Sequence, residues 1–158
     1  ANETAIKSNS LKDYSLIHFA THGIVDESNP ELSRIYLQND SKTEDGNLFA
    51  GEIYNLEFNA SLVSLSACQT GLGKISKGEG VIGLSRALVY AGAKNILVSF
   101  WSVADESTAQ LMTDFYRKML DNPNESYSQS LRKAKLNLLT MEKYKSPFYW
   151  APFVLIGF

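Results

Sequence analysis

The chain has 158 residues, of which 44% are hydrophobic and 20% charged, as expected for one globular domain with a single core. With 15 basic and 17 acidic residues the net charge is −2, so no strong field attracts nucleic acid or an acidic lipid surface. One cysteine excludes an internal disulfide, and with two histidines it falls short of a structural zinc set, although a mixed carboxylate site stays open. The sequence contains neither a signal-peptide pattern nor an apolar run of about 18 residues. We therefore expect a cytoplasmic protein without a metal or organic cofactor, and with neither nucleic acid nor membrane as its partner.

The first 13 residues are polar and begin without a methionine, with a short helix expected over residues 3–9. We interpret residues 1–13 as the lead-in of a cut fragment and residues 14–158 as the domain. Residues 14–20 then predict the first core strand. Its apolar run around His18 is typical of a strand that helices cover on both faces of a sheet.

A second core strand is predicted over residues 63–67, where three apolar residues alternate with two serines. This strand leads directly into Cys68. The glycines of residues 70–80, Gly71 and Gly73 among them, then favour a loop. The only cysteine of the chain therefore lies at a strand end beside a glycine-rich segment.

The remaining elements are predicted from apolar periodicity and from helix start and stop signals. Short strands are expected over residues 33–38 and Asn47–Phe49, and core strands over residues 95–101 and Phe153–Gly157. Helices are expected over residues 51–56, Glu79–Tyr90, Asp105–Asp121 and 126–142. Met112 lies in the apolar stripe of the third of these helices, and Ser126 and Gln129 have the spacing of a capping box at the start of the last. Alternation of strands and helices of this kind predicts an α/β fold with a largely parallel sheet.

Cys68 needs a base before it can act as a nucleophile, because an ordinary thiol is largely protonated at neutral pH. His22 falls at the end of the first core strand, 46 residues before Cys68. His18 lies within that strand, and we expect it to be a buried structural histidine without a catalytic role. Each residue of the pair also has a structural interpretation: a free cysteine often fills a core as a small hydrophobe, and a loop histidine can simply bond the backbone.

The order of histidine before cysteine argues against nucleophile-elbow enzymes, whose nucleophile comes first. It resembles the caspase-like cysteine proteases, in which the histidine lies about 50 residues upstream of the cysteine. The closer resemblance is to the CHAT family, the separase-related and caspase-like domains usually attached to tetratricopeptide repeats. Five segments carry it in the right order: HFATHG (18–23), LSACQTG (65–71), GEGVIGLSRALVYAGA (78–93), SFWSVAD (99–105) and PFYWAPFVLIG (147–157).

This resemblance implies a caspase-like layered α/β fold, with a mostly parallel central sheet flanked by helices. Sheets of that type have further strands before the histidine strand, so we expect N-terminal strands of the full domain to be missing here. The resemblance also implies an upstream tetratricopeptide-repeat or other sensor domain in the full-length protein, and a regulated bacterial protease that acts on a protein or peptide substrate.

The implied activity is that of a cysteine-type endopeptidase related to caspases and separase, in which His22 and Cys68 form the dyad. By the same resemblance, the backbone N–H groups of Gly23 and Cys68 bind the oxyanion of the reaction. Removal of one donor of this kind typically costs about 2.7 to 4 kcal/mol of transition-state stabilisation.

Asp105 is the candidate specificity residue, because the segment from Trp101 to Asp105 resembles the separase segment whose acidic residue accepts a basic side chain. We therefore expect Asp105, with Trp101, to bind substrate and to favour a basic P1 residue. Ser102 and Asp105 also fit a helix N-cap pattern, which is the structural interpretation of the same residues.

Two other classes of function are open on the sequence alone. The domain can be a non-catalytic caspase-like interaction or scaffold module, in which partners bind the sheet edge or the cleft. It can also be a transferase or non-peptide hydrolase that uses the same dyad, and comparison of peptide with thioester substrates separates this alternative from a protease.

Overall fold

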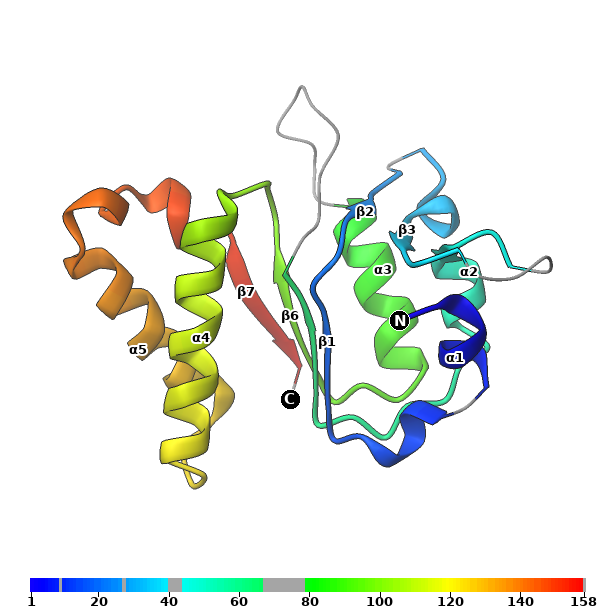
Figure 1. Cartoon of the computed structure of the whole chain (residues 1–158), viewed down its shortest axis with the longest axis horizontal. Helices are drawn as coiled ribbons and strands as arrows, with labels where there is room; N and C mark the ends of the chain where they lie inside the picture. Colours follow the sequence, from blue (N-terminus) through cyan, green and yellow to red (C-terminus); the bar gives the residue numbers. More distant parts are fainter. Residues whose placement is uncertain (9, 27, 40–43, 67–78, 158) are drawn as a thin grey trace.

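The computed structural model describes residues 1–8, 10–26, 28–39, 44–66 and 79–157. These residues form an α/β fold in which a central sheet is flanked by helices on both faces (Figure 1). Its helices are α1 (Glu3–Lys7), α2 (Ala50–Ile53), α3 (Glu79–Tyr90), α4 (Asp105–Asp121) and α5 (Tyr127–Thr140). Its strands are β1 (Leu16–Phe19), β2 (Gly23–Ile24), β3 (Arg34–Tyr36), β4 (Asn47–Phe49), β5 (Leu62–Leu65), β6 (Asn95–Ser99) and β7 (Phe153–Gly157). Short 3₁₀ turns lie at Ser10–Asp13, Pro30–Leu32, Glu142–Tyr144 and Pro147–Tyr149.

The central sheet has the strand order β1-β5-β6-β7. Strands β1, β5 and β6 are parallel, and β7 runs antiparallel to β6. The pairing of β1 with β5 keeps one constant register, from Leu16 opposite Leu62 to Phe19 opposite Leu65. The mostly parallel sheet expected of a caspase-like fold is thereby confirmed.

Two apolar cores lie on opposite faces of this sheet. On one face, β5 and β6 direct alternate side chains such as Val63 and Ile96 into a core that they share with α2 and α3. On the other face, Leu62 and Leu97 pack with α4 and α5, whose buried stripe includes the fully buried Phe115. Figure 1 shows the two layers, with α4 and α5 on one side of the sheet and α1, α2 and α3 on the other.

Strand β1 is buried on only one face, which corrects the prediction that helices cover both. Ile17 and Phe19 are buried, whereas Leu16 and His18, on the opposite face, are exposed. Helix α4 lies on that face and reaches β5, where the Tyr116 hydroxyl donates to Ser64 Oγ over 2.9 Å. Tyr116 also contacts the ring of His18, while Leu16, at the start of the strand, is 39% exposed.

A second, smaller sheet branches from the end of β1. It is antiparallel with the order β2-β3-β4, and β2 begins at Gly23, four residues after the last residue of β1. The chain therefore leaves the central sheet after Phe19 and immediately enters the second sheet. This branch point fixes the backbone on both sides of His22.

Several predicted element bounds are confirmed. Helices α3 and α4 and strand β7 have the predicted ends, and Ser126 and Gln129 form the predicted capping box of α5. Gly92 lies two residues after the end of α3 and has a φ of +106°. A Cβ added at this position would lie 2.1 Å from the carbonyl oxygen of Phe58. That conformation and that close approach both require glycine.

The N-terminal residues contribute to the fold. Ile6 of α1 is buried in the core on the α2 and α3 side, and the predicted helix near this residue is confirmed. Cys68 and most of the predicted glycine-rich loop lie outside the described residues. Among the helices of the described ranges, none is both long enough and apolar enough to cross a bilayer.

Candidate functional site

A pocket of about 500 Å³ lies at the C-terminal ends of β1 and β5, against one side of α4. Its lining includes the predicted base His22, the predicted specificity residue Asp105, and Ser66, which is two residues before Cys68. The other lining residues are His18, Ala20, Thr21, Thr108, Ala109, Met112, Thr113 and Tyr116. The structure therefore brings the predicted base and the predicted specificity residue into one hollow.

A larger hollow of about 660 Å³ lies at the opposite end of the strands. Its lining includes Ser15, Asn95 and Tyr127, and in the described part of the chain it holds neither of the two histidines. Because a base is needed to activate a nucleophile, we place the candidate site at the smaller pocket.

The backbone at His22 is held by Tyr36 of β3. The Tyr36 N–H donates to the His22 carbonyl over 2.8 Å, and the Thr21 hydroxyl donates to the Tyr36 carbonyl over 2.7 Å. The imidazole of His22 is exposed at the pocket. A fixed backbone with an accessible ring is an arrangement suited to a general base.

Gly23 is buried next to this histidine at the start of β2. It pairs with Ile35, and the hydrogen bond from the Tyr36 N–H to the His22 carbonyl flanks that pair. In an antiparallel ladder, bonds on the flanking residues identify a pair that exchanges no direct hydrogen bonds. The Gly23 N–H is therefore not used by the ladder with β3.

His18 lies in the pocket, and the prediction that it is a buried structural histidine is wrong. Its ring is exposed on the open face of β1, with Nε2 2.8 Å from Ser66 Oγ and its centroid 5.6 Å from that of Tyr116. Partial burial against such neighbours lowers the pKa of His18 below its ordinary value, so the ring is neutral at pH 7. An apolar run around a histidine did not mean that both faces of the strand are covered.

Helix α4 forms the pocket wall, with Met112 and Tyr116 on the face that packs toward the sheet. Burial raises the pKa of Tyr116, while its hydrogen bond to Ser64 acts in the other direction, and the net effect keeps the phenol protonated. Sequence reasoning placed Met112 on the buried stripe of this helix but missed Tyr116. The 3.6-residue period identifies the buried face of a helix, but not which of its residues reach a neighbouring pocket.

Asp105 is the first residue of α4 and lines the pocket with an exposed side chain. The N-cap of the helix is Ala104, and no side chain caps it, so the predicted capping role of Ser102 is wrong. Trp101 does not line the pocket. Its indole N–H donates to the Phe148 carbonyl over 3.0 Å, and its ring lies 6.5 Å from the Phe148 ring.

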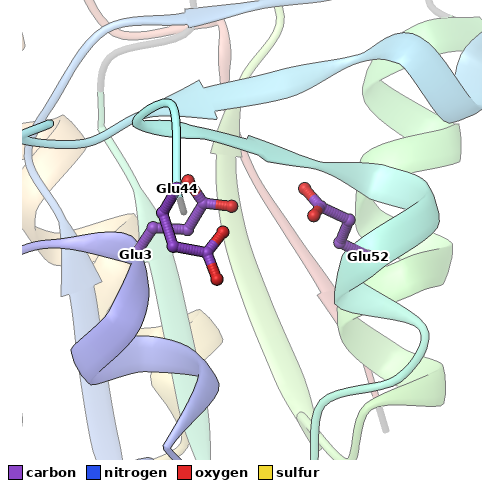
Figure 2. Close-up of side chains that lie close together, drawn as sticks. All are labelled: Glu3, Glu44 and Glu52. Atoms are coloured by element: carbon purple, nitrogen blue, oxygen red, sulfur yellow. The ribbon is translucent and has the colours of Figure 1, made fainter. Parts of the chain in front are cut away.

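The described residues also contain a group of three carboxylates, from Glu3, Glu44 and Glu52, away from this pocket (Figure 2). Lys7 Nζ contacts all three, at 2.6 Å from Glu3 and 2.7 Å from each of the others. The lysine ammonium thus takes the place that a bound cation would need. We interpret this group, here called the Lys7 cluster, as an ion-pair network that joins α1 to the segment before β4 and to α2.

Comparison with known proteins agrees with the fold. The sequence model of the CHAT domain family matches residues 1–158. Over 110 residues, the chain is 31% identical to tetratricopeptide repeat protein 28 of Mus musculus and 32% identical to that of Homo sapiens. These alignments cover 70% of this chain but only 4% of each relative. With a match over its whole length, the chain belongs to the CHAT domain family, which is related to the caspase-like cysteine peptidases.

Proposed function

We propose that this domain is a cysteine endopeptidase in which His22 is the general base and Cys68 the nucleophile. The observation that supports this most strongly is the register of β1 and β5. Within every pair of that ladder, the two residue numbers differ by 46, and the numbers of His22 and Cys68 differ by the same amount. Each of the two residues follows its strand by three positions, and parallel strands lie about 4.8 Å apart. Equal lengths of chain after paired strand ends favour a short distance between the imidazole and the thiol.

In the proposed reaction, His22 takes the thiol proton of Cys68 as the sulfur attacks the carbonyl carbon of the scissile peptide bond. The tetrahedral oxyanion is bound by the N–H groups of Gly23 and Cys68. His22 then gives the proton to the leaving amine, the C–N bond breaks and a thioester remains. Water, deprotonated by His22, hydrolyses the thioester, and the proton returns to the thiol.

The pocket supports the proposal of a basic P1 residue. Asp105 is the only carboxylate among the described lining residues, and Ala109 and Met112 supply apolar surface along the same helix. The aliphatic stem of a lysine or arginine packs on such a surface while its cationic end pairs with a carboxylate. Trp101 lies outside this lining, so the proposed P1 subsite does not use it.

We further propose that a sensor domain made of tetratricopeptide repeats precedes this domain in the full-length protein. Support comes from the names of the two relatives, which are tetratricopeptide repeat proteins, and from the small share of their length that this chain spans. Both relatives are mammalian, and the sequence-based expectation of a bacterial protease remains a prediction.

The test is hydrolysis of two fluorogenic peptides that differ only in P1, arginine against aspartate. The proposal predicts that the arginine peptide is cleaved faster and that Cys68→Ala and His22→Ala each abolish cleavage. A folded wild-type protein that cleaves neither peptide, but binds a partner through this face, would instead indicate an interaction module.

A further inference from the structure

His18 is not a member of the dyad proposed above, but it contacts a residue that is close to Cys68 in the sequence. The imidazole lines the same pocket as His22, and its Nε2 contacts Ser66 Oγ at 2.8 Å. Ser66 directly follows the last residue of β5 and precedes Cys68 by two positions. A side chain of β1 thereby contacts the chain that leads to the proposed nucleophile.

Ser66 is joined to β1 in two ways. Its backbone N–H donates to the Phe19 carbonyl over 3.3 Å, and its hydroxyl meets the imidazole of His18. The first bond extends the parallel ladder by one residue but leaves the serine free to rotate about its own backbone angles. The second bond adds a side-chain constraint, so Ser66 is held to β1 through both its backbone and its side chain.

We propose that His18 is a positioning residue, which holds Ser66 in place two positions before the proposed nucleophile Cys68. The inference rests on the proposed function, because positioning has a consequence only if Cys68 reacts. It differs from the dyad in that His18 moves no proton in the reaction and touches no reacting atom. Its role depends on one atom, Nε2, and on one partner, Ser66 Oγ.

The chemistry of the pair suits this role. A neutral imidazole has one donor and one acceptor nitrogen, and a hydroxyl is both donor and acceptor, so the bond forms with either tautomer. A neutral ring also adds no positive charge to the pocket when His22 becomes protonated in the reaction. The ring stands on a rigid strand and packs against Tyr116, whose hydroxyl is itself held by Ser64 of β5.

Two amides of different length test the role of Nε2. In glutamine, the terminal amide atoms reach the position of Nε2, whereas in asparagine they reach only that of Nδ1. We compare wild type, His18→Gln, His18→Asn, Ser66→Ala and the double variant His18→Asn/Ser66→Ala. The readouts are the inactivation rate constant and the inhibition constant for a peptidyl ketone with arginine at P1, together with the thermal midpoint.

The expected result is a loss of about 10- to 100-fold in the inactivation rate constant for His18→Asn and Ser66→Ala, since small displacements of reacting groups have effects of this size. The inhibition constant stays unchanged, because the P1 subsite is intact. His18→Gln recovers most of the rate, and the double variant is within about twofold of either single variant, as expected for residues that act through one contact.

Two results would overturn the inference alone. One is labelling that depends on His22 but is the same in wild type, His18→Asn and Ser66→Ala. The other is a loss in His18→Gln as large as that in His18→Asn. If instead the wild type shows no labelling that depends on His22, the proposed function fails and the inference with it. If a His18 variant has a lowered thermal midpoint, Ser66→Ala decides the question, because it removes the other partner of the same contact.

Discussion

Phe19 and Leu65 are register partners at the ends of two parallel strands, and three residues after each comes a member of the proposed dyad. After Phe19 the chain turns into the second sheet, where Tyr36 fixes the backbone at His22. After Leu65, Ser66 is bonded to β1 through both its backbone and its side chain. The strand pairing thus holds Phe19 beside Leu65, and the bonds beyond it hold His22 and Ser66 just after the two strand ends.

The first prediction concerns P1 specificity. Asp105→Asn should lower kcat/KM for the arginine peptide by about 10- to 100-fold, because a hydrogen bond to a charged group is worth about 1.5 to 3 kcal/mol. The matched control is Glu106→Gln, since Glu106 neighbours Asp105 but pairs with Lys143 and does not line the pocket. Equal losses in the two variants would contradict the assignment of Asp105 to the subsite.

The second prediction concerns the support of His22. Thr21→Val removes the hydroxyl that donates to the Tyr36 carbonyl and keeps the shape of the side chain. We expect kcat to fall while the free energy of unfolding changes by only about 1 kcal/mol. Thr140→Val, which removes an equivalent hydroxyl bond to the Asn137 carbonyl far from the pocket, should leave kcat unchanged. Steady-state kinetics and urea unfolding of both variants check this, and unchanged kcat in Thr21→Val would exclude the support.

The third prediction concerns the contact of α4 with β5. Tyr116→Phe leaves the fully buried Ser64 hydroxyl without its donor, at a cost of about 1 to 3 kcal/mol in unfolding free energy. Ser64→Ala in the same chain removes the other partner, so the double variant should recover much of that loss. Chemical denaturation measures the cycle. Additive losses would mean that the two hydroxyls do not stabilise each other.

The fourth prediction concerns the Lys7 cluster. Glu3 is 2% exposed, so Lys7→Met leaves a buried carboxylate without its cation and should cost about 3 kcal/mol of unfolding free energy. The hydrogen bond from Lys7 lowers the pKa of Glu44 in the folded protein. Stability from this pair is therefore present above the unfolded pKa of a glutamate and is lost as the pH falls through the lower folded value. The acid-induced loss should be smaller in Lys7→Met, and Lys94→Met is the control, since Lys94 is an exposed lysine.

The fifth prediction follows from the lowered pKa of His18. As the pH falls from neutrality, the unfolded chain takes up a proton at this residue before the folded chain does, so stability decreases between the ordinary and the folded pKa. The ring contacts Ser66 and Tyr116, and the other titratable groups that line the same pocket are His22 and Asp105. His18→Gln should lose less stability than wild type when urea unfolding is compared at pH 7.5 and pH 5. Identical losses in wild type and His18→Gln would contradict it.

The fold was largely predictable because local signals agree with the packing. Helix α4 combines a clear stripe, from Met112 through Phe115 to Met119, with well-defined ends. The start of α4 was predicted less well. The spacing of Ser102 and Asp105 is typical of an N-cap at Ser102, whereas the N-cap in the structure is Ala104. The covered faces of β1 were mispredicted for a different reason. Leu16 is apolar yet exposed, and only the position of α4 over β5 determines that.

The site was predictable where it depends on strand ends. His22 and Asp105 follow different elements of the sheet, and the C-terminal ends of parallel strands meet at one edge. The contributions of Tyr116 and Tyr36 were not predictable. They depend on how α4 crosses the sheet and on how the second sheet joins β1, and neither is encoded in the spacing of a single segment.

The most direct test of the proposed His22 and Cys68 dyad uses the fact that Cys68 is the only cysteine of the chain. Intact-mass spectrometry after reaction with the arginine peptidyl ketone counts adducts, and peptide mapping locates them. A His22 and Cys68 dyad predicts one adduct per chain, on Cys68. The adduct should be lost in His22→Ala but not in the Glu106→Gln control. An adduct that forms equally fast in His22→Ala, or that maps to another residue, would contradict the His22 and Cys68 dyad.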